Sequence, residues 1–163
     1  MAADDFRKSV ARPLGQIPSG LFILTARNAD ERGGMLASWV QQVCFEPPVI
    51  SVSVAKGSPV MTLISGSRQF SLCQIPEDDK VLMRRFAKGT EPGQDPFMGL
   101  DLVAPTNAAA PILGDALGYL ECELIAHLDV EGDHDLFVGR VIGGGALSSA
   151  APHVHIRKDG FKY

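Results

Sequence analysis

The chain has 163 residues, 45% hydrophobic and 21% charged, which is typical of one soluble domain covering residues 1–163. Its formal charge of −4 gives nucleic acids and anionic membranes no general reason to bind, and no run of 18 apolar residues predicts a membrane span. Cys44, Cys73 and Cys122 lack C-x-x-C spacing and the acidic N-terminus does not resemble a signal peptide, so we expect a protein of the reducing cytoplasm.

The N-terminal quarter of the chain predicts a short helix followed by a β-hairpin. Residues 5–10 can form a helical turn, which Pro13 should end early. β-branched and aromatic residues then predict strands over 21–25 and 35–44, joined by the polar loop 28–33. The two strands are close enough in sequence to pair with each other.

The middle of the chain predicts further strands and short helices. Residues 49–54 alternate strictly between apolar and polar, which makes them the strongest strand prediction. Ser58 can cap a helix that begins at Pro59 and ends at Gly66. The remaining predictions are a strand over 69–75, a helix over 78–88 with Val81, Leu82 and Phe86 on one side, and strands over 118–128, 136–142 and 153–156. Because parallel sheets need a crossover helix after nearly every strand, these elements favour an antiparallel barrel.

Two motifs are weak when their context is considered. Residues 143–148 nearly spell a dinucleotide-binding fingerprint, but the third glycine is missing and no βαβ unit fits, so we predict a glycine turn. His153 and His155 would share a strand face, where His134 or His127 could complete a metal site. Scattered histidines without a carboxylate in motif spacing are more often surface or hydrogen-bonded residues, so no metal is predicted.

Two polar clusters are better candidates for ligand contacts. Lys56 and Ser58, at the end of a strand and the start of a helix, offer a positive charge, free N–H groups and a hydroxyl, which suit a phosphate. The alternative is an ordinary helix start beside a solvated lysine. Ser38 and Gln42 share one face of the predicted strand and could form hydrogen bonds with the edge of a heterocycle. The alternative is an ordinary half-exposed strand in which Trp39 faces the core.

Several segments together resemble the flavin reductase-like, FMN-binding split-barrel family, and in particular the flavin reductase domain attached to cyanobacterial-type flavodiiron proteins. The resemblance runs in the family's order from about residue 20 to the end of the chain. The segments that carry it are residues 34–42, 45–48, 52–56, 110–123, 132–134 and 155–163.

The resemblance implies a mainly β fold with short helices, arranged as a six-stranded antiparallel Greek-key split barrel. It also implies a homodimer with FMN bound non-covalently in a groove at the dimer interface. The residues implied along the isoalloxazine and ribityl chain are Met35, Leu36, Ala37, Ser38, Trp39, Val40, Gln42, Ser53, Val54 and Ala55. Those implied elsewhere are Lys56 and Ser58 near the phosphate, Arg85, Phe86 and Lys88 on a second helical contact, and His134, Arg157 and Tyr163 toward the open flavin face.

The implied activity is that of an FMN-dependent NAD(P)H oxidoreductase, a flavin reductase that passes a hydride from NAD(P)H to bound FMN and electrons on to an acceptor. The flavin performs this chemistry, which explains why the sequence shows no obvious catalytic constellation beyond the candidate His134. An alternative is a flavoredoxin-like FMN-binding electron carrier that a redox protein partner reduces. A cofactor-free interaction module is less favoured, because it leaves the Lys56 corner unexplained.

Two departures from the family limit what carries over. The flavodiiron proteins have a long metal-binding and flavodoxin portion that 163 residues cannot contain, so we do not expect oxygen reduction at a di-iron centre in this chain. Many related reductases have a Ser/Thr-rich strand where this chain has Trp39 and Gln41–Gln42. The choice between NADH and NADPH and the retention of flavin therefore stay open at this stage.

Overall fold

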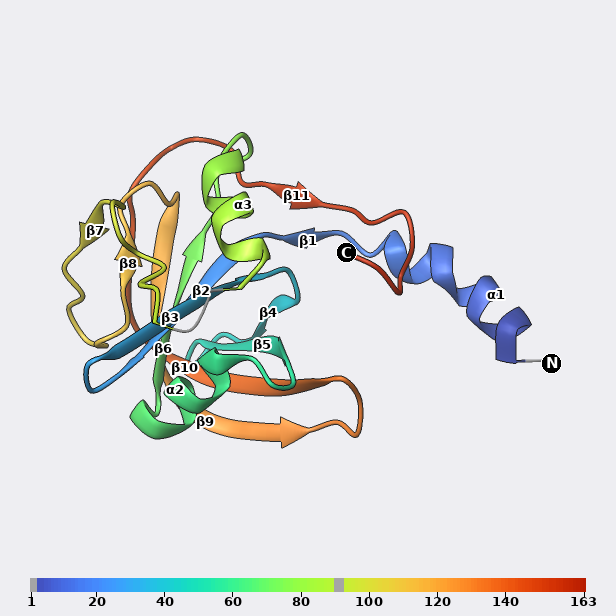
Figure 1. The fold of residues 1–163 in the computed structure, drawn as a ribbon, viewed down its shortest axis with the longest axis horizontal. Helices are drawn as coiled ribbons and strands as arrows, with labels where there is room; N and C mark the ends of the chain where they lie inside the picture. The colour runs from blue at the N-terminus through green and yellow to red at the C-terminus, as the bar shows by residue number, and fades with distance from the viewer. Residues whose placement is uncertain (1–2, 90–92) are drawn as a thin grey trace.

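The computed structural model describes residues 3–89 and 93–163 and forms a barrel from which one arm projects (Figure 1). The helices are α1 (Ala3–Gly15), α2 (Pro59–Ser67) and α3 (Lys80–Ala87). The longer strands are β2 (Phe22–Asn28), β3 (Glu31–Ala37), β4 (Val40–Cys44), β5 (Val49–Ala55), β6 (Gln69–Gln74), β9 (Gly118–Asp129) and β10 (His134–Ala146). The short strands, which pair as β1 with β11 and β7 with β8, are β1 (Ser19–Gly20), β7 (Leu102–Val103), β8 (Ile112–Leu113) and β11 (Val154–His155). No helix among these is long and apolar enough to cross a membrane.

The longer strands form one antiparallel sheet in the order β3-β2-β6-β9-β10-β5-β4. β3 and β4 lie at opposite ends of this order, yet only Ser38 and Trp39 separate them in the chain. The Trp39 carbonyl also accepts a hydrogen bond from the Ser53 amide at 3.0 Å, on β5. The sheet therefore closes on itself, with β3 and β4 as two halves of one bent strand. Counted this way the barrel has six strands, which confirms the predicted mainly β, antiparallel fold.

The hairpin prediction is confirmed, but its boundaries were wrong. The strand predicted over 35–44 is two strands, because the chain bends at Ser38 and Trp39. The predicted loop 28–33 is mostly strand, since the ladder between β2 and β3 continues to the pair of Asn28 and Glu31. Backbone pairing thus outweighs the polar character of these residues, and only a tight turn at residues 29–30 remains.

The ends of the helices also differ from prediction. α1 continues through Pro13 to Gly15, because carbonyls of its last turns find partners in the C-terminal segment. One of these bonds joins the Gly160 amide to the Ala11 carbonyl at 2.7 Å. α2 ends at Ser67 rather than at Gly66, with the next residue in the left-handed conformation, and the Ser58 side chain makes no capping bond to it.

Two smaller predictions were wrong as well. In α3, Val81 is 70% exposed, whereas Leu82 and Phe86 are buried as predicted, so the apolar side is narrower than the sequence suggested. Residues 143–146 are not a turn but the end of β10, paired with β9. A Cβ on Gly144 would lie 2.6 Å from the Tyr119 carbonyl oxygen, so glycine is needed for this close approach of the two strands.

Two apolar clusters hold the structure together. The first fills the barrel and packs it against α2; its largest fully buried members are Leu24, Ile64, Phe70, Leu72 and Phe137. The second lies on the other face of β2, β3 and β6, where α3 and the segment after it pack; its largest fully buried members are Leu21, Ile23, Ile75, Leu82, Phe86, Phe97 and Ile112. The edge of β3 therefore lies between two packed layers.

The buried carboxylate of Glu121 on β9 binds the loop at residues 106–108 and holds it against the barrel. Glu121 is fully buried and accepts hydrogen bonds from the amides of Thr106, Asn107 and Ala108 at 2.9 to 3.0 Å. The Thr106 hydroxyl donates a further bond at 2.7 Å. Burial opposes the charged carboxylate, but these donors outweigh it and lower the pKa of Glu121 to about 2. Glu121 is therefore expected to stabilise the fold only while it is ionised.

We expect Glu121→Gln to lower the free energy of unfolding by roughly 2 to 3 kcal/mol, because an amide cannot accept all the donors aimed at a carboxylate. The folded pKa lies below the ordinary value of 4.5, so this contribution is complete above that pH and is lost as the pH falls toward 2. Denaturant unfolding across this range should show a weaker pH dependence in the variant. Glu123→Gln, on the same strand but exposed, is the control, and an equal effect in both would contradict this role.

Candidate functional site

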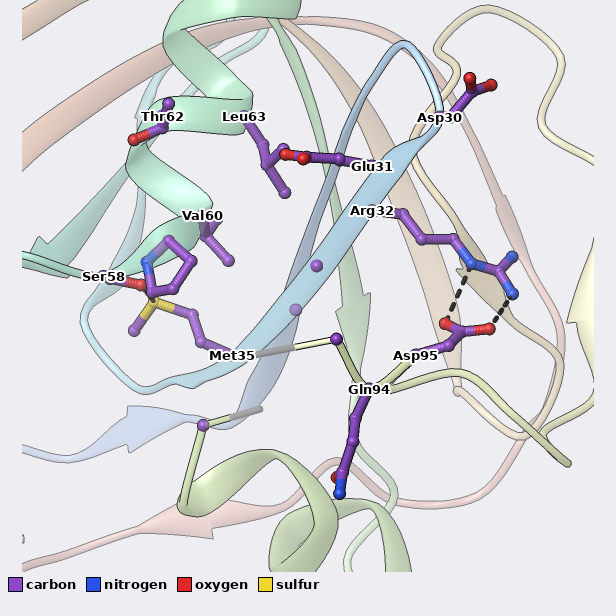
Figure 2. Close-up of a pocket in the computed structure, with 15 residues that line it drawn as sticks. Asp30, Glu31, Arg32, Met35, Ser58, Val60, Thr62, Leu63, Gln94 and Asp95 are labelled. Carbon is purple, nitrogen blue, oxygen red and sulfur yellow. Dashed lines mark hydrogen bonds and ion pairs between the residues drawn. The ribbon is translucent and has the colours of Figure 1, made fainter. Parts of the chain in front are cut away.

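The candidate site lies along one edge of β3. This strand pairs with β2 on one side and has no strand partner on the other within the described residues. Beside the free edge is a cavity of about 760 Å³, bounded by β3, the start of α2 and the segment around Asp95 (Figure 2). Its lining consists of residues 30–35, Ser58, Pro59, Val60, Thr62, Leu63, Gly89 and residues 93–95. A free strand edge offers alternating backbone donors and acceptors, so this cavity can bind a ligand that has a polar edge.

At Gly33 and Gly34 the cavity wall consists of backbone without a side chain. A Cβ on Gly33 would meet the Leu63 side chain of α2 at 3.0 Å, and a Cβ on Gly34 would meet the ring of Phe86 at 2.8 Å. The two glycines thus let α2 and α3 pack closely on opposite faces of β3. The sequence analysis did not single out this pair, although two adjacent glycines, one ending the predicted loop and one beginning the segment 34–42, were the available signal.

A half-buried ion pair closes one end of the cavity. The guanidinium of Arg32 contacts the carboxylate of Asp95 through two bonds, at 2.5 and 3.1 Å (Figure 2). The hydrogen bond from Arg32 is the main cause of the lowered pKa of Asp95. The same guanidinium lies 5.3 Å from the ring centroid of Phe97. This pair ties β3 to the segment after α3, and it was also missed at the sequence level.

The other end of the cavity is the start of α2. The Ser58 hydroxyl lies 3.6 Å from the Met35 sulfur and does not cap the helix. The first N–H groups of α2 are thus left without a side-chain acceptor, and the helix dipole favours negative charge there. Of the residues implied by the family resemblance, Met35 and Ser58 line this cavity.

An aromatic cluster lies where β3 passes into β4. The ring of Trp39 lies 4.9 Å from that of His134 and 5.7 Å from that of Tyr163, centroid to centroid. The guanidinium carbon of Arg157 lies 5.1 Å from the Trp39 ring. The structure thus brings Trp39 together with His134, Arg157 and Tyr163, which the family resemblance had implied as one group without Trp39.

The hydrogen bonds of His134 define its tautomer. Its Nδ1 lies 2.8 Å from a carboxylate oxygen of Asp133, and its Nε2 lies 3.1 Å from the hydroxyl of Tyr163. A carboxylate only accepts, so in the neutral ring Nδ1 carries the hydrogen and Nε2 accepts from the tyrosine. The bond from His134 lowers the pKa of Asp133. His134 therefore presents an oriented ring next to Trp39.

Ser38 has a buried hydroxyl without a partner. The sequence predicted that this residue shares a strand face with Gln42. That prediction was wrong, because Ser38 lies in the bend between β3 and β4. Its Oγ is one of the buried polar atoms of the described chain that lack a hydrogen bond. An unpaired buried hydroxyl is costly unless a ligand or water satisfies it, so Ser38 is a candidate ligand contact.

Lys56 is engaged away from the cavity. Its ammonium group lies 2.7 Å from Asp129 and 3.5 Å from Asp135, and the bond to Asp129 is the main cause of its raised pKa. It is not among the residues that line the cavity. A contact between Lys56 and a phosphate stays a prediction.

The other residues implied by the resemblance are dispersed. Ala37, Val54 and Phe86 are buried in the core, whereas Leu36, Ser53 and Ala55 are partly buried on β3 and β5. Val40 and Gln42 line a separate groove of about 550 Å³. Arg85 donates to the Met98 carbonyl, and Lys88 is exposed at the end of α3. In the described chain no group of three or more histidine, cysteine or acidic side chains is arranged to hold a metal ion.

The arrangement of an open strand edge beside an aromatic cluster agrees with a family match. Residues 14–162 match the family described as Flavin reductase like domain. The chain belongs to the flavin reductase-like domain family. This membership supports a role in flavin-linked oxidation and reduction. Most of α1 precedes the matched segment.

Related proteins include two from cyanobacteria. The chain is 40% identical over 158 residues to the putative diflavin flavoprotein A 3 of Nostoc sp., covering 93% of this chain and 26% of that protein. It is 38% identical over 154 residues to the diflavin flavoprotein A 1 of Synechocystis sp., with the same coverages. The chain therefore spans about a quarter of the length of these relatives.

Solved structures show the same fold. The NADH:FAD oxidoreductase of Streptomyces globisporus has a TM-score of 0.84 and 24% identity, with 99% of this chain and 93% of that chain covered. The nitrilotriacetate monooxygenase component B homolog of Mycobacterium thermoresistibile has a TM-score of 0.82 and 24% identity, with coverages of 96% and 86%.

Proposed function

We propose that this domain is an FMN-dependent NAD(P)H oxidoreductase, which takes a hydride from NAD(P)H at bound FMN and passes the electrons to an acceptor. The observation that carries the proposal is the position of the Trp39 and His134 cluster directly after the free edge of β3. The family match supports flavin as the cofactor, and a structural neighbour named as an NADH:FAD oxidoreductase supports the nicotinamide as electron donor.

The residues present fit a flavin. The cavity volume of about 760 Å³ lies within the range of small-molecule sites, roughly 300 to 1,000 Å³. The free edge of β3 suits the polar edge of a heterocycle, and the unpaired Ser38 hydroxyl supplies one more polar contact nearby. The start of α2 with Ser58 suits a phosphate. When bound, FMN accepts the hydride and releases electrons.

The protein's own groups bind and orient rather than react. The β3 edge fixes the position of a planar ligand, and Trp39 offers an aromatic surface for stacking. Arg157 adds positive charge beside this surface, which favours anionic groups of an incoming nucleotide. His134, held by Asp133 and Tyr163, keeps one ring orientation at the same place. The candidate role of His134 is to hold the nicotinamide in position.

Lys56 can still serve a phosphate. Its partner Asp129 is 64% exposed, so solvent screens this ion pair and it contributes little to stability. A doubly charged phosphate can therefore replace Asp129 while Lys56 keeps its longer contact with Asp135. The proposal keeps Lys56 as a phosphate contact on this ground.

A second candidate function is that of an FMN-containing electron carrier reduced by a redox protein. The observation that favours it is the exposure of the aromatic cluster, since Tyr163 is 79% exposed and accessible to a protein surface. The two functions differ in whether a nicotinamide alone can reduce the flavin.

We expect the FMN-loaded protein to lose its visible flavin absorbance when NADH or NADPH is added without oxygen. The expectation follows from the proposed position of the nicotinamide beside Trp39 and His134. The measurement is an anaerobic titration with each nucleotide, with dithionite as the control that bound flavin is reducible. Bleaching by dithionite alone would exclude the oxidoreductase and favour the carrier.

We expect His134→Ala to slow flavin reduction by roughly ten- to a hundredfold while FMN affinity and melting temperature change little, because His134 positions the donor. Stopped-flow reduction and flavin titration measure the two effects. His127→Ala is the control, since this histidine contacts Asp135 and Phe137 instead of the cluster. An unchanged rate in stable, flavin-loaded His134→Ala would remove this residue from the site.

We also propose that the domain forms a homodimer. Phe45, just after the edge strand β4, is 87% exposed, and Val43 on β4 is also exposed. The chain exposes 9456 Å², whereas an ordinary folded chain of this mass exposes about 7,900 Å². We expect light scattering to report a dimer at micromolar concentration, and Phe45→Asp to shift it toward monomer. A monomeric protein with FMN fully bound would contradict the proposal.

A further inference from the structure

Helix α1 and the C-terminal segment form one arm, which projects from the barrel (Figure 1). The Gly160 amide donates to the Ala11 carbonyl at 2.7 Å, and the Arg157 amide donates to the Gly15 carbonyl at 2.9 Å. The Arg157 side chain adds a bond to the Leu14 carbonyl at 3.3 Å. The two parts of the arm are thus joined through their backbones.

The packing within the arm leaves no space for a side chain at position 160. A Cβ on Gly160 would lie 2.3 Å from the Cβ of Leu14 and 2.9 Å from the Ala11 carbonyl oxygen. A Cβ on Gly15 would likewise lie 2.8 Å from the Arg157 carbonyl oxygen. A change at these positions must therefore push the C-terminal segment away from α1.

A cation–π contact holds the outer part of the arm. The guanidinium carbon of Arg7 lies 4.2 Å from the ring centroid of Phe161. The next residue, Lys8, instead pairs with Asp4 on the same helix, and both of these side chains are mostly exposed. Arg7 and Lys8 therefore carry the same charge at adjacent positions, but the guanidinium of Arg7 contacts Phe161, whereas the ammonium of Lys8 pairs within α1.

The same segment supplies two members of the aromatic cluster. Arg157 contacts α1 while its guanidinium lies beside Trp39, and Tyr163 reaches His134 and Trp39. Before this point the segment is held by the pairing of β11 with β1, which ends at His155. Beyond His155, the segment contacts both α1 and the cluster, and the contacts with α1 join it to the arm.

We propose that α1 is a positioning element of the nicotinamide subsite: residues 7–15 hold the C-terminal segment so that Tyr163 and Arg157 form the outer wall of the site at Trp39. This inference rests on the proposed function for the identity of the ligand. It assigns a role to a helix that lies mostly outside the matched family segment.

The test uses Trp39 as its reporter, because it is the only tryptophan in the chain. Two variants disturb the arm, Gly160→Ala by steric conflict and Arg7→Ala by loss of the cation–π contact. Lys8→Ala is the matched control. In the flavin-free protein we expect both arm variants to change the emission and the acrylamide quenching of Trp39, and Lys8→Ala to leave them unchanged.

In the FMN-loaded protein we expect the two arm variants to raise the KM for the nicotinamide roughly three- to tenfold, with kcat little changed, because a wall of the subsite is displaced. Adding Tyr163→Ala to Gly160→Ala should raise KM no further, since the tyrosine has already left. If Gly160→Ala does not fold, Arg7→Ala carries the test.

The remaining outcomes distinguish a failure of the positioning role from a failure of the proposed function. Unchanged emission in the arm variants would overturn the positioning role, and so would changed emission with an unchanged KM. If no nicotinamide reduces even the unaltered protein, the proposed function fails. The assignment of the wall to a nicotinamide subsite fails with it, whereas the emission data still decide whether α1 positions Tyr163.

Discussion

The bend at Ser38 and Trp39 is the constraint on which the rest of the structure depends. Because the chain turns there, one continuous stretch provides strands at both ends of the sheet order, and the barrel closes. The bend also separates β3 from β5, so that within residues 3–89 and 93–163 one edge of β3 has no strand partner. The residues of the bend are thereby placed next to a free strand edge, where a ligand can bind.

Two adjacent glycines leave part of the cavity wall as plain backbone, between the charged side chains of residues 30–32 and Asp95. Gly33 and Gly34 let two helices pack against β3, so its edge is rigid and close to the cavity. An exposed backbone edge at these glycines suits a cofactor that brings its own reactivity. A cofactor of this kind needs no catalytic constellation from the protein, and His134 and Tyr163, hydrogen-bonded to each other, are the two titratable groups of the aromatic cluster besides Arg157.

The elements that were predicted well are those in which local pattern and tertiary environment agree. Residues 49–54 alternate, and the alternate side chains are indeed buried in the barrel. The errors fall where long-range contacts override local preference. α1 continues through Pro13 because the C-terminal segment satisfies its carbonyls, and the glycines after Gly143 extend β10 because β9 approaches closely.

The sequence by itself determined the class of fold, the order of the strands along the chain, and the motifs that resemble a flavin-binding family. The class of fold and the order of strands follow from periodicity and short-range spacing, which a single chain records directly, whereas the motifs are known only by their resemblance to the family. Only the tertiary structure decided that Trp39 meets His134, Arg157 and Tyr163, and that Lys56 pairs with acidic residues outside the cavity. Such contacts join segments far apart in the chain, and the barrel closure that brings them together has no local signature.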